Sequence, residues 1–146
     1  MHFEGEFIVN LPREKVWEYI SDPHSALDYV PNIQELKVQN PDRFTATVGV
    51  GVGSIKGNFN LEFEMVENVP PNHTRIKARG SGIKSTVDFE TTVDLSATGD
   101  GKTNMRWSAE GNAGGLIAGV GQRLMRMAAE KMVSQLFERL KTQLEK

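Results

Sequence analysis

Residues 114–146 read GGLIAGVGQRLMRMAAEKMVSQLFERLKTQLEK, a stretch without proline in which apolar residues recur at helical spacing. This pattern predicts one long amphipathic helix at the end of the chain. Its first two turns would hold Gly114, Gly115, Gly119 and Gly121, and each interior glycine costs a helix roughly 1 kcal/mol relative to alanine. The expected reason for this cost is that a sheet, or a ligand held between helix and sheet, lies close against the helix.

The rest of the chain carries mainly strand signals. Residues 2–9 alternate between two faces, and Asn10-Leu11-Pro12 then favours the start of the first of two short helices, around residues 16–20 and 25–29. Further strands are predicted at 33–39, 43–51, 54–67, 74–82, 85–97 and 102–111. Short turns between strands favour an antiparallel meander. We therefore expect a single α+β domain over residues 1–146, with a seven-stranded antiparallel sheet wrapped around the long C-terminal helix.

The composition excludes several classes of protein. The chain has no cysteine, which excludes disulfides, thiolate metal sites and cysteine nucleophiles and suits a reducing compartment. Its 17 basic and 19 acidic residues are interspersed and form no broad basic surface, so nucleic acid is not an expected partner. No apolar run approaches the ~18 residues of a membrane span, and the start MHFEGEFIVN lacks the features of a signal peptide. We expect a cytoplasmic protein.

The apolar parity of the strands is almost free of ionisable groups, and this pattern argues against acid–base or nucleophilic catalysis. An ordinary filled core is one interpretation. Small residues on the same parity, together with methionines on the helix, favour instead a cavity for a hydrophobic small molecule. The residues expected to line it are Tyr29, Phe59, Leu61, Phe63, Phe89, Met105, Trp107, Val120, Leu124, Met127 and Ala128. The small residues on the sheet side are Gly57, Ala78, Gly80 and Gly82.

No motif indicates a cofactor or a metal. The run Gly49-Val50-Gly51-Val52-Gly53 lacks the spacing of a phosphate-binding loop. The histidines, His2, His24 and His73, show no ligand spacing. Three bases, Arg75, Lys77 and Arg79, share one strand face, which is interpreted as a solvated surface or, alternatively, as a patch for an acidic partner.

Three segments carry a resemblance to a known family, that of the G subunit of carbon monoxide dehydrogenase. Residues 51–59, GVGSIKGNF, resemble a strand turn of this family; Asp22-Pro23 followed by residues 29–32, YVPN, resembles its helix pair; and residues 114–124 resemble the glycine-rich start of its terminal helix. The match covers essentially the whole chain, and none of these motifs is catalytic. The resemblance implies the START-related helix-grip fold, in which the sheet grips the helix and encloses a hydrophobic cavity.

The resemblance also implies a function. It implies a non-enzymatic accessory role for a molybdenum-containing carbon monoxide dehydrogenase or related hydroxylase, with recruitment to the membrane and handling of a lipophilic molecule such as a quinone or lipid. Many members carry an additional C-terminal tail with a membrane-directed segment, whereas this chain ends at Lys146 on the helix, so direct anchoring is not expected and any membrane contact would be peripheral.

Two alternatives stay open. One is a docking factor for the enzyme that binds no ligand. The other is a small cyclase or hydrolase, since one fold hosts many functions. The polar groups available for such an enzyme are His24, Asp28, Tyr29 and Thr91.

Overall fold

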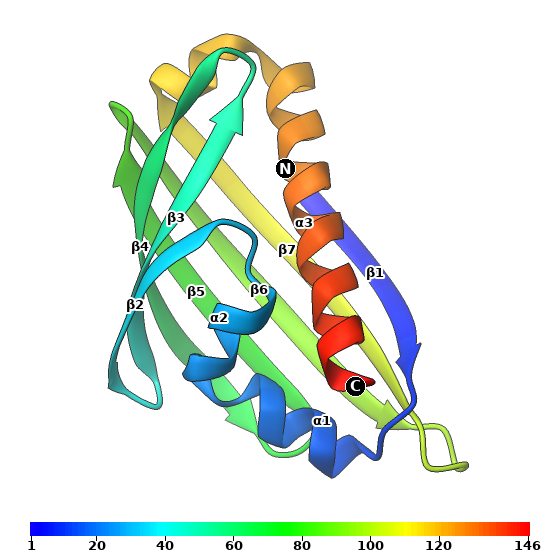
Figure 1. Cartoon of the computed structure of the whole chain (residues 1–146). Helices are drawn as coiled ribbons and strands as arrows, with labels where there is room; N and C mark the ends of the chain where they lie inside the picture. Colours follow the sequence, from blue (N-terminus) through cyan, green and yellow to red (C-terminus); the bar gives the residue numbers. More distant parts are fainter.

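A computed structural model describes all residues, Met1–Lys146. The elements follow in the order β1 (His2–Val9), α1 (Arg13–Ile20), the 3₁₀ helix η1 (Pro23–Ser25), α2 (Ala26–Tyr29), β2 (Ile33–Asn40), β3 (Arg43–Val52), β4 (Ile55–Val69), β5 (His73–Gly82), β6 (Ser85–Ala97), β7 (Thr103–Gly115), the 3₁₀ helix η2 (Leu116–Val120) and α3 (Gln122–Leu144). Figure 1 shows α3 lying across one face of the sheet, with α1 and α2 at one end of it.

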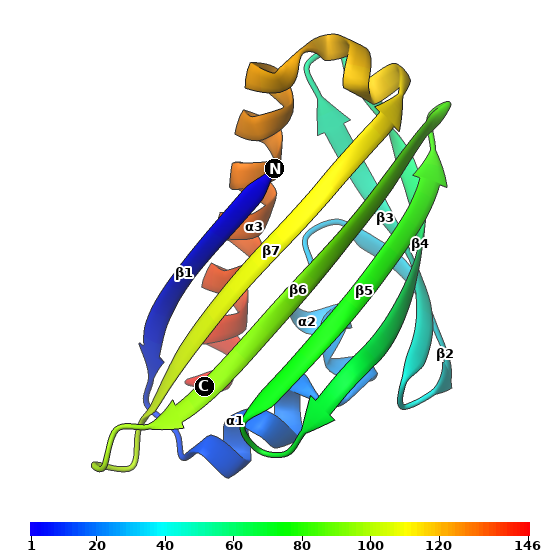
Figure 2. The same ribbon diagram turned by 180° about the vertical axis from the view of Figure 1, so that it is seen from behind.

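The seven strands form one antiparallel sheet in the order β1-β7-β6-β5-β4-β3-β2. The meander from β2 to β7 ends beside β1, so β1 and β2 are the two edges, and the helical segment α1–η1–α2 crosses from one edge to the other (Figure 2). The predicted α+β architecture, its seven antiparallel strands and its long terminal helix are confirmed. Strands β1 and β6 have the predicted bounds, and the other five differ by a few residues at their ends.

The start of α3 differs from the prediction. Residues 114–121 are not its first turns, because Gly114 and Gly115 end β7, and η2 follows before α3 begins at Gln122. Gly115 and Gly121 have φ angles of 79° and 100°, a region that favours glycine because it has no Cβ. A Cβ on Gly115 would also lie 2.4 Å from the backbone oxygen of Lys84. These glycines therefore serve a change of chain direction rather than a helix packed closely against a sheet.

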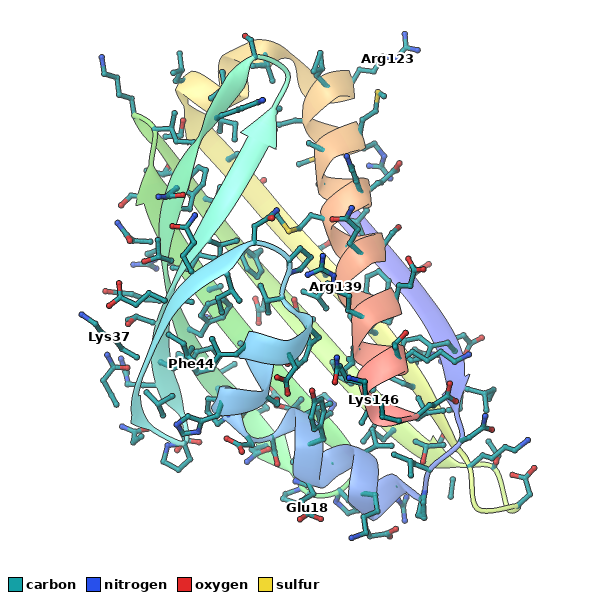
Figure 3. All side chains as sticks on the ribbon, viewed as in Figure 1. Glu18, Lys37, Phe44, Arg123, Arg139 and Lys146 are labelled. Carbon is teal, nitrogen blue, oxygen red and sulfur yellow. The ribbon has the colours of Figure 1, made fainter.

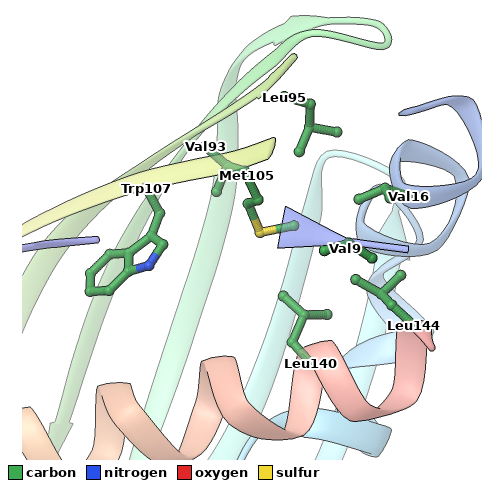
Figure 4. Packing of buried hydrophobic residues seen from close by; sticks show 8 residues of the cluster. All are labelled: Val9, Val16, Val93, Leu95, Met105, Trp107, Leu140 and Leu144. Carbon is green, nitrogen blue, oxygen red and sulfur yellow. The ribbon is translucent and has the colours of Figure 1, made fainter. Parts of the chain in front are cut away.

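The core is divided into two clusters of buried side chains. The first, called cluster 1 here, joins α1, β1, β6, β7 and the end of α3 through Val9, Val16, Val93, Leu95, Met105, Trp107, Leu140 and Leu144 (Figure 4). The second, cluster 2, joins β3, β4 and η2 through Ala46, Val48, Val52, Phe59, Leu61 and Ile117. The charged side chains that the strand parity placed outside, such as Glu62, Asp88 and Arg106, are exposed.

The glycines of β5 do not create the free space that the sequence suggested. A Cβ on Gly80 would lie 2.3 Å from Cδ2 of Leu61, and one on Gly82 would lie 2.0 Å from the backbone oxygen of Asn58. Real Cβ atoms do not approach other atoms this closely, so the neighbouring β4 already occupies the volume. These two glycines allow β4 and β5 to pass close to each other.

Candidate functional site

The helix α3 packs against α2, against β1 and β3, and through its C-terminal half against β6 and β7. Its backbone comes closest to the sheet at β3 on one side and β1 on the other (Figure 1). The middle strands β4, β5 and β6 lie beneath it, and several of their inward side chains are only half-buried: Phe63, Met65, Ile76, Phe89 and Thr91. These side chains keep part of their surface accessible, whereas Phe59 and Leu61 on the same face of β4 are buried.

Aromatic rings form the wall of this region on the sheet side. The rings of Phe44 and Phe63 stack with centroids 4.6 Å apart, and Phe89 meets Phe63 edge-on at 6.2 Å. On the helix side, Met125, Ala128 and Met132 pack against cluster 2. The region between α3 and β4–β6, called the inner space here, is thus bounded by rings and by flexible methionine side chains, which adapt to apolar guests of irregular shape.

The residues predicted to line a cavity occupy three different environments. Four are buried inside the two clusters: Phe59, Leu61, Met105 and Trp107. Five are half-buried: Tyr29, Phe63, Phe89, Val120 and Ala128. Leu124 and Met127 are exposed, with 42% and 61% of their surface accessible. The eleven predicted residues therefore do not share one environment, and Leu124 and Met127 do not face the interior.

Met127 projects away from the sheet, contrary to its predicted place. At 3.6 residues per turn, it lies about 200° around the helix from Met125, which packs inward. Met127 was expected at the cavity because methionines are concentrated in the middle of the helix, and this composition does not tell which of them face the sheet. Met125 and Met132, which do pack inward, were not among the predicted lining residues.

Two surface hollows accompany the inner space, and both are polar. One, of about 660 Å³, lies on the outer face of β2–β6, where Thr47, Asn60, Ser81 and Thr86 line its floor. The other, of about 480 Å³, lies between α2 and α3 and is lined by Asp28, Gln135, Glu138, Arg139, Thr142 and Gln143. Sequence reasoning missed the second hollow, although the spacing of four between Gln135, Arg139 and Gln143 places these residues on one helix face.

The basic residues of β5 lie between acidic neighbours. Arg79 stands opposite Glu62 on β4 and Asp88 on β6, and Lys77 stands opposite Glu64 and Glu90. Arg75 makes ion pairs with Glu67 and Glu90 at 3.1 and 2.8 Å. The charges alternate across the sheet, which favours the interpretation of this face as a solvated surface over that of a patch for an acidic partner.

The polar groups considered for an enzyme are not brought together. No hydrogen bond joins any two of His24, Asp28, Tyr29 and Thr91; His24 instead meets Asp22 at 2.9 Å, and Asp28 accepts a 2.9 Å bond from the Tyr19 hydroxyl. Burial raises the pKa of Tyr29, and burial together with the Asp28 hydrogen bond raises the pKa of Tyr19 well above its usual range. Both phenols therefore stay protonated at neutral pH. No set of three or more His, Cys, Asp or Glu side chains is arranged to hold a metal ion.

One histidine makes the stability of the sheet depend on pH. Nδ1 and Nε2 of His73 lie 2.7 Å from carboxylate oxygens of Asp94 and Glu67 respectively, and these hydrogen bonds raise the pKa of His73. Because the folded pKa lies above the unfolded one, the stabilisation is fully present below the unfolded value of about 6.5 and is lost as pH rises through the folded value.

We therefore expect the melting temperature to fall as the pH is raised above about 6.5, and the variant His73→Asn to lose most of this dependence. Thermal unfolding followed by circular dichroism across this range measures the effect. Asp94→Asn, which removes one of the two partners, is expected to give an intermediate slope. Equal slopes for the wild type and His73→Asn would contradict the assignment.

Comparison with known proteins agrees with this geometry. The family model that describes the G subunit of carbon monoxide dehydrogenase (CoxG) matches residues 5–145. The chain belongs to this family. No curated protein matches the chain. None of the helices of this CoxG family member is both long and apolar enough to cross a membrane.

Solved structures share the fold of this CoxG family member. A conserved protein from Geobacillus kaustophilus is 23% identical with a TM-score of 0.89, and the match covers 99% of this chain and 95% of that one. A START superfamily protein from Mycobacterium smegmatis is 12% identical with a TM-score of 0.74, covering 99% and 97%. The Zhui aromatase/cyclase from Streptomyces sp. R1128 is 11% identical with a TM-score of 0.73, covering 99% and 93%. The fold is therefore of the START-like helix-grip type.

Proposed function

We propose that this protein binds a hydrophobic small molecule, of the lipid or quinone class, in the inner space between α3 and strands β4–β6. The observation that carries the proposal is the accessible surface left on Phe63 and Phe89, which lie on the inward face of the sheet but are only partly buried. Ligand sites are concave, mostly apolar and supplied with a few polar groups. Membership of a family with the START-like fold supports a ligand-binding or accessory role.

The family description suggests the context in which the ligand is handled. We infer an accessory, non-enzymatic role beside a carbon monoxide dehydrogenase or a related molybdenum-containing hydroxylase. The separation of the candidate polar groups favours this role over catalysis, because a cyclase or hydrolase needs acid and base groups within reach of one substrate. Co-purification with tagged protein from the native host tests the partner, and recovery of no dehydrogenase or hydroxylase subunit would count against it.

A second candidate function is docking to that enzyme without a ligand. It is favoured by apolar side chains that face solvent: Leu116, Leu124 and Met127 are 50%, 42% and 61% exposed. Leu124 and Met127 are three residues apart on α3 and are therefore neighbours on its surface, and exposed apolar patches are typical of interaction sites. The two functions are separated by whether an apolar probe enters the inner space of the purified protein.

A pair of aromatic insertions tests the ligand site. Ala128 packs inward against cluster 2, whereas its neighbour Met127 faces solvent. We expect Ala128→Phe to fill the inner space and reduce binding of the fluorescent apolar probe diphenylhexatriene at least tenfold, with little loss of stability. The matched control Met127→Phe is expected to bind the probe like the wild type.

The opposite pattern would argue for a filled core. If Ala128→Phe destabilised the fold by about 1–3 kcal/mol, the typical cost of overpacking, and the wild type bound no probe, the inner space would not accept a guest. Mass spectrometry of solvent extracts from the purified protein provides a second readout, since a lipophilic molecule should be recovered from the wild type and not from Ala128→Phe.

A further inference from the structure

The polar hollow between α2 and α3 lies beside the inner space. Arg139 is on the side of α3 that faces α2 and the segment after it (Figure 3). Asp28 enters the hollow from α2, and Gln135 lies one helical turn before Arg139. All six lining residues are polar, so this hollow, called the α2–α3 hollow here, differs in chemistry from the aromatic wall next to it.

Apolar side chains connect the α2–α3 hollow with the inner space. Met132, which packs against cluster 2, lies one turn from Gln135 and Leu136 on α3, and side chains three and four residues apart are neighbours on a helix. On the other wall, Tyr29 follows Asp28 directly and packs against cluster 1, and Val30 packs against cluster 2. A molecule lying along Met132 in the inner space would therefore reach the hollow with one end.

Arg139 is available to such a molecule. The arginines that form ion pairs are Arg13, Arg43, Arg75, Arg106 and Arg126. Arg139 forms none of them, so its guanidinium keeps its five N–H donors free for an acceptor oxygen. Asp28 already accepts a hydrogen bond from Tyr19 at 2.9 Å, which fixes the carboxylate at the edge of the hollow with acceptor capacity left.

The mixture of charges selects among head groups. An anionic head would gain from Arg139 but would also face the carboxylates of Asp28 and Glu138, and a cationic head would face Arg139. A neutral head that carries both carbonyl and hydroxyl groups can accept from Arg139 and donate to Asp28. The amides of Gln135 and Gln143 and the hydroxyl of Thr142 both donate and accept, so they suit the same kind of head.

We propose that the α2–α3 hollow holds the polar head of an amphipathic ligand whose tail occupies the inner space, and that this head is uncharged with both hydroxyl and carbonyl groups. This inference rests on the proposed function, because it requires an apolar tail in the inner space. In this proposal Arg139 and Asp28 select the ligand by its head group, and the aromatic rings and methionines bind its tail.

Three amphiphiles with the same lauryl chain test the inference: monolauroylglycerol, laurate and lauryltrimethylammonium, each below its critical micelle concentration. Isothermal titration calorimetry is expected to give the tightest binding for monolauroylglycerol. Arg139→Met keeps the apolar stem but removes the donors and should weaken this binding about tenfold or more, because hydrogen bonds to a charged group are lost. Arg139→Lys should restore part of the affinity.

Arg123→Met serves as the matched control, because Arg123 lies on the exposed first turn of α3 and outside the hollow. It should leave monolauroylglycerol binding unchanged. Diphenylhexatriene, which has no polar head, should bind wild type and Arg139→Met equally. Thermal unfolding shows whether each variant is folded. If Arg139→Met does not fold, Gln135→Leu provides a second test, and it is expected to weaken monolauroylglycerol binding several-fold.

The possible failures are distinguishable. If diphenylhexatriene does not bind the wild type, the proposed function fails, and the head-group inference fails with it. If the probe binds but Arg139→Met and Gln135→Leu leave monolauroylglycerol binding unchanged, only the head-group inference is overturned. Tighter binding of laurate or of lauryltrimethylammonium than of monolauroylglycerol would overturn the assignment of an uncharged head.

Discussion

Replacing Gly82 with alanine is expected to destabilise the protein by about 3 kcal/mol or more, at or beyond the upper end of ordinary overpacking. The added Cβ would lie 2.0 Å from the backbone oxygen of Asn58 and 3.1 Å from Cα of Phe59. Backbone atoms cannot rotate away as a side chain does, so β4 and β5 would have to separate. Urea denaturation measured by circular dichroism gives the change in free energy of unfolding.

Gly51→Ala is the matched control, because it also replaces a strand glycine but its Cβ would meet Cγ of Lys56 at 3.8 Å and the backbone oxygen of Ile55 at 4.0 Å, both ordinary van der Waals distances. We expect Gly51→Ala to be neutral or slightly stabilising, since alanine reduces the entropy of the unfolded chain. Similar losses for both variants would show that β4 and β5 do not approach each other as closely as described.

The second prediction with a large effect compares a residue of the core, Phe59, with a residue that borders the inner space, Phe63. Phe59 is 2% exposed within cluster 2, and Phe59→Ala is expected to cost about 3–5 kcal/mol, the usual range for removing a buried phenylalanine ring. Phe63 is on the same strand face but half-buried. Phe63→Ala should cost clearly less stability, because part of the ring is not packed.

For ligand binding, Phe63→Ala should have the larger effect and Phe59→Ala the smaller one. Phe63→Ala is expected to weaken binding of diphenylhexatriene several-fold, because it removes a ring that stacks on Phe44 and borders the inner space. A folded Phe59→Ala protein should still bind the probe. Equal losses of stability for the two variants would indicate that Phe63 is as tightly packed as Phe59 and that the inner space is filled.

Most of the fold could be predicted from the sequence because its signals are local. Alternation along 85–97 gave the bounds of β6, and short turns between strands predicted the antiparallel sheet. The strand parity also separated Phe59 and Trp107, which are buried, from Glu62 and Arg106, which are exposed. Alternation with a period of two residues indicates which face of a strand is buried, whatever element covers that face.

The end of β7 could not be predicted in this way. Gly114–Gly121 follow the apolar spacing of a helix, yet Gly115 and Gly121 adopt positive φ angles and η2 lies between them. Periodicity does not distinguish a glycine within a helix from one that turns the chain. The deciding contact is the approach of the Lys84 backbone oxygen to Gly115, which comes from a distant turn.

The candidate site was predicted in part for a related reason. The apolar residues of the strands were assigned to the correct face, but which of them stay half-buried depends on how α3 packs across the sheet. The α2–α3 hollow depends on the packing of α2 against α3 and brings Asp28 near Arg139. Asp28 and Arg139 are far apart in the sequence, and no local pattern indicates that they lie close together. The α2–α3 hollow was therefore not predicted.

The division of the core into two clusters gives α3 two separate anchors, one for each half of the helix. Leu140 and Leu144 are held in cluster 1, with 4% and 5% of their surface accessible. The other end of the helix joins η2 through Gly121, which adopts a φ of 100°. From there Met125, Ala128 and Met132 hold the first half of α3 against cluster 2, so a change that loosens one cluster would free only the half of the helix that this cluster holds.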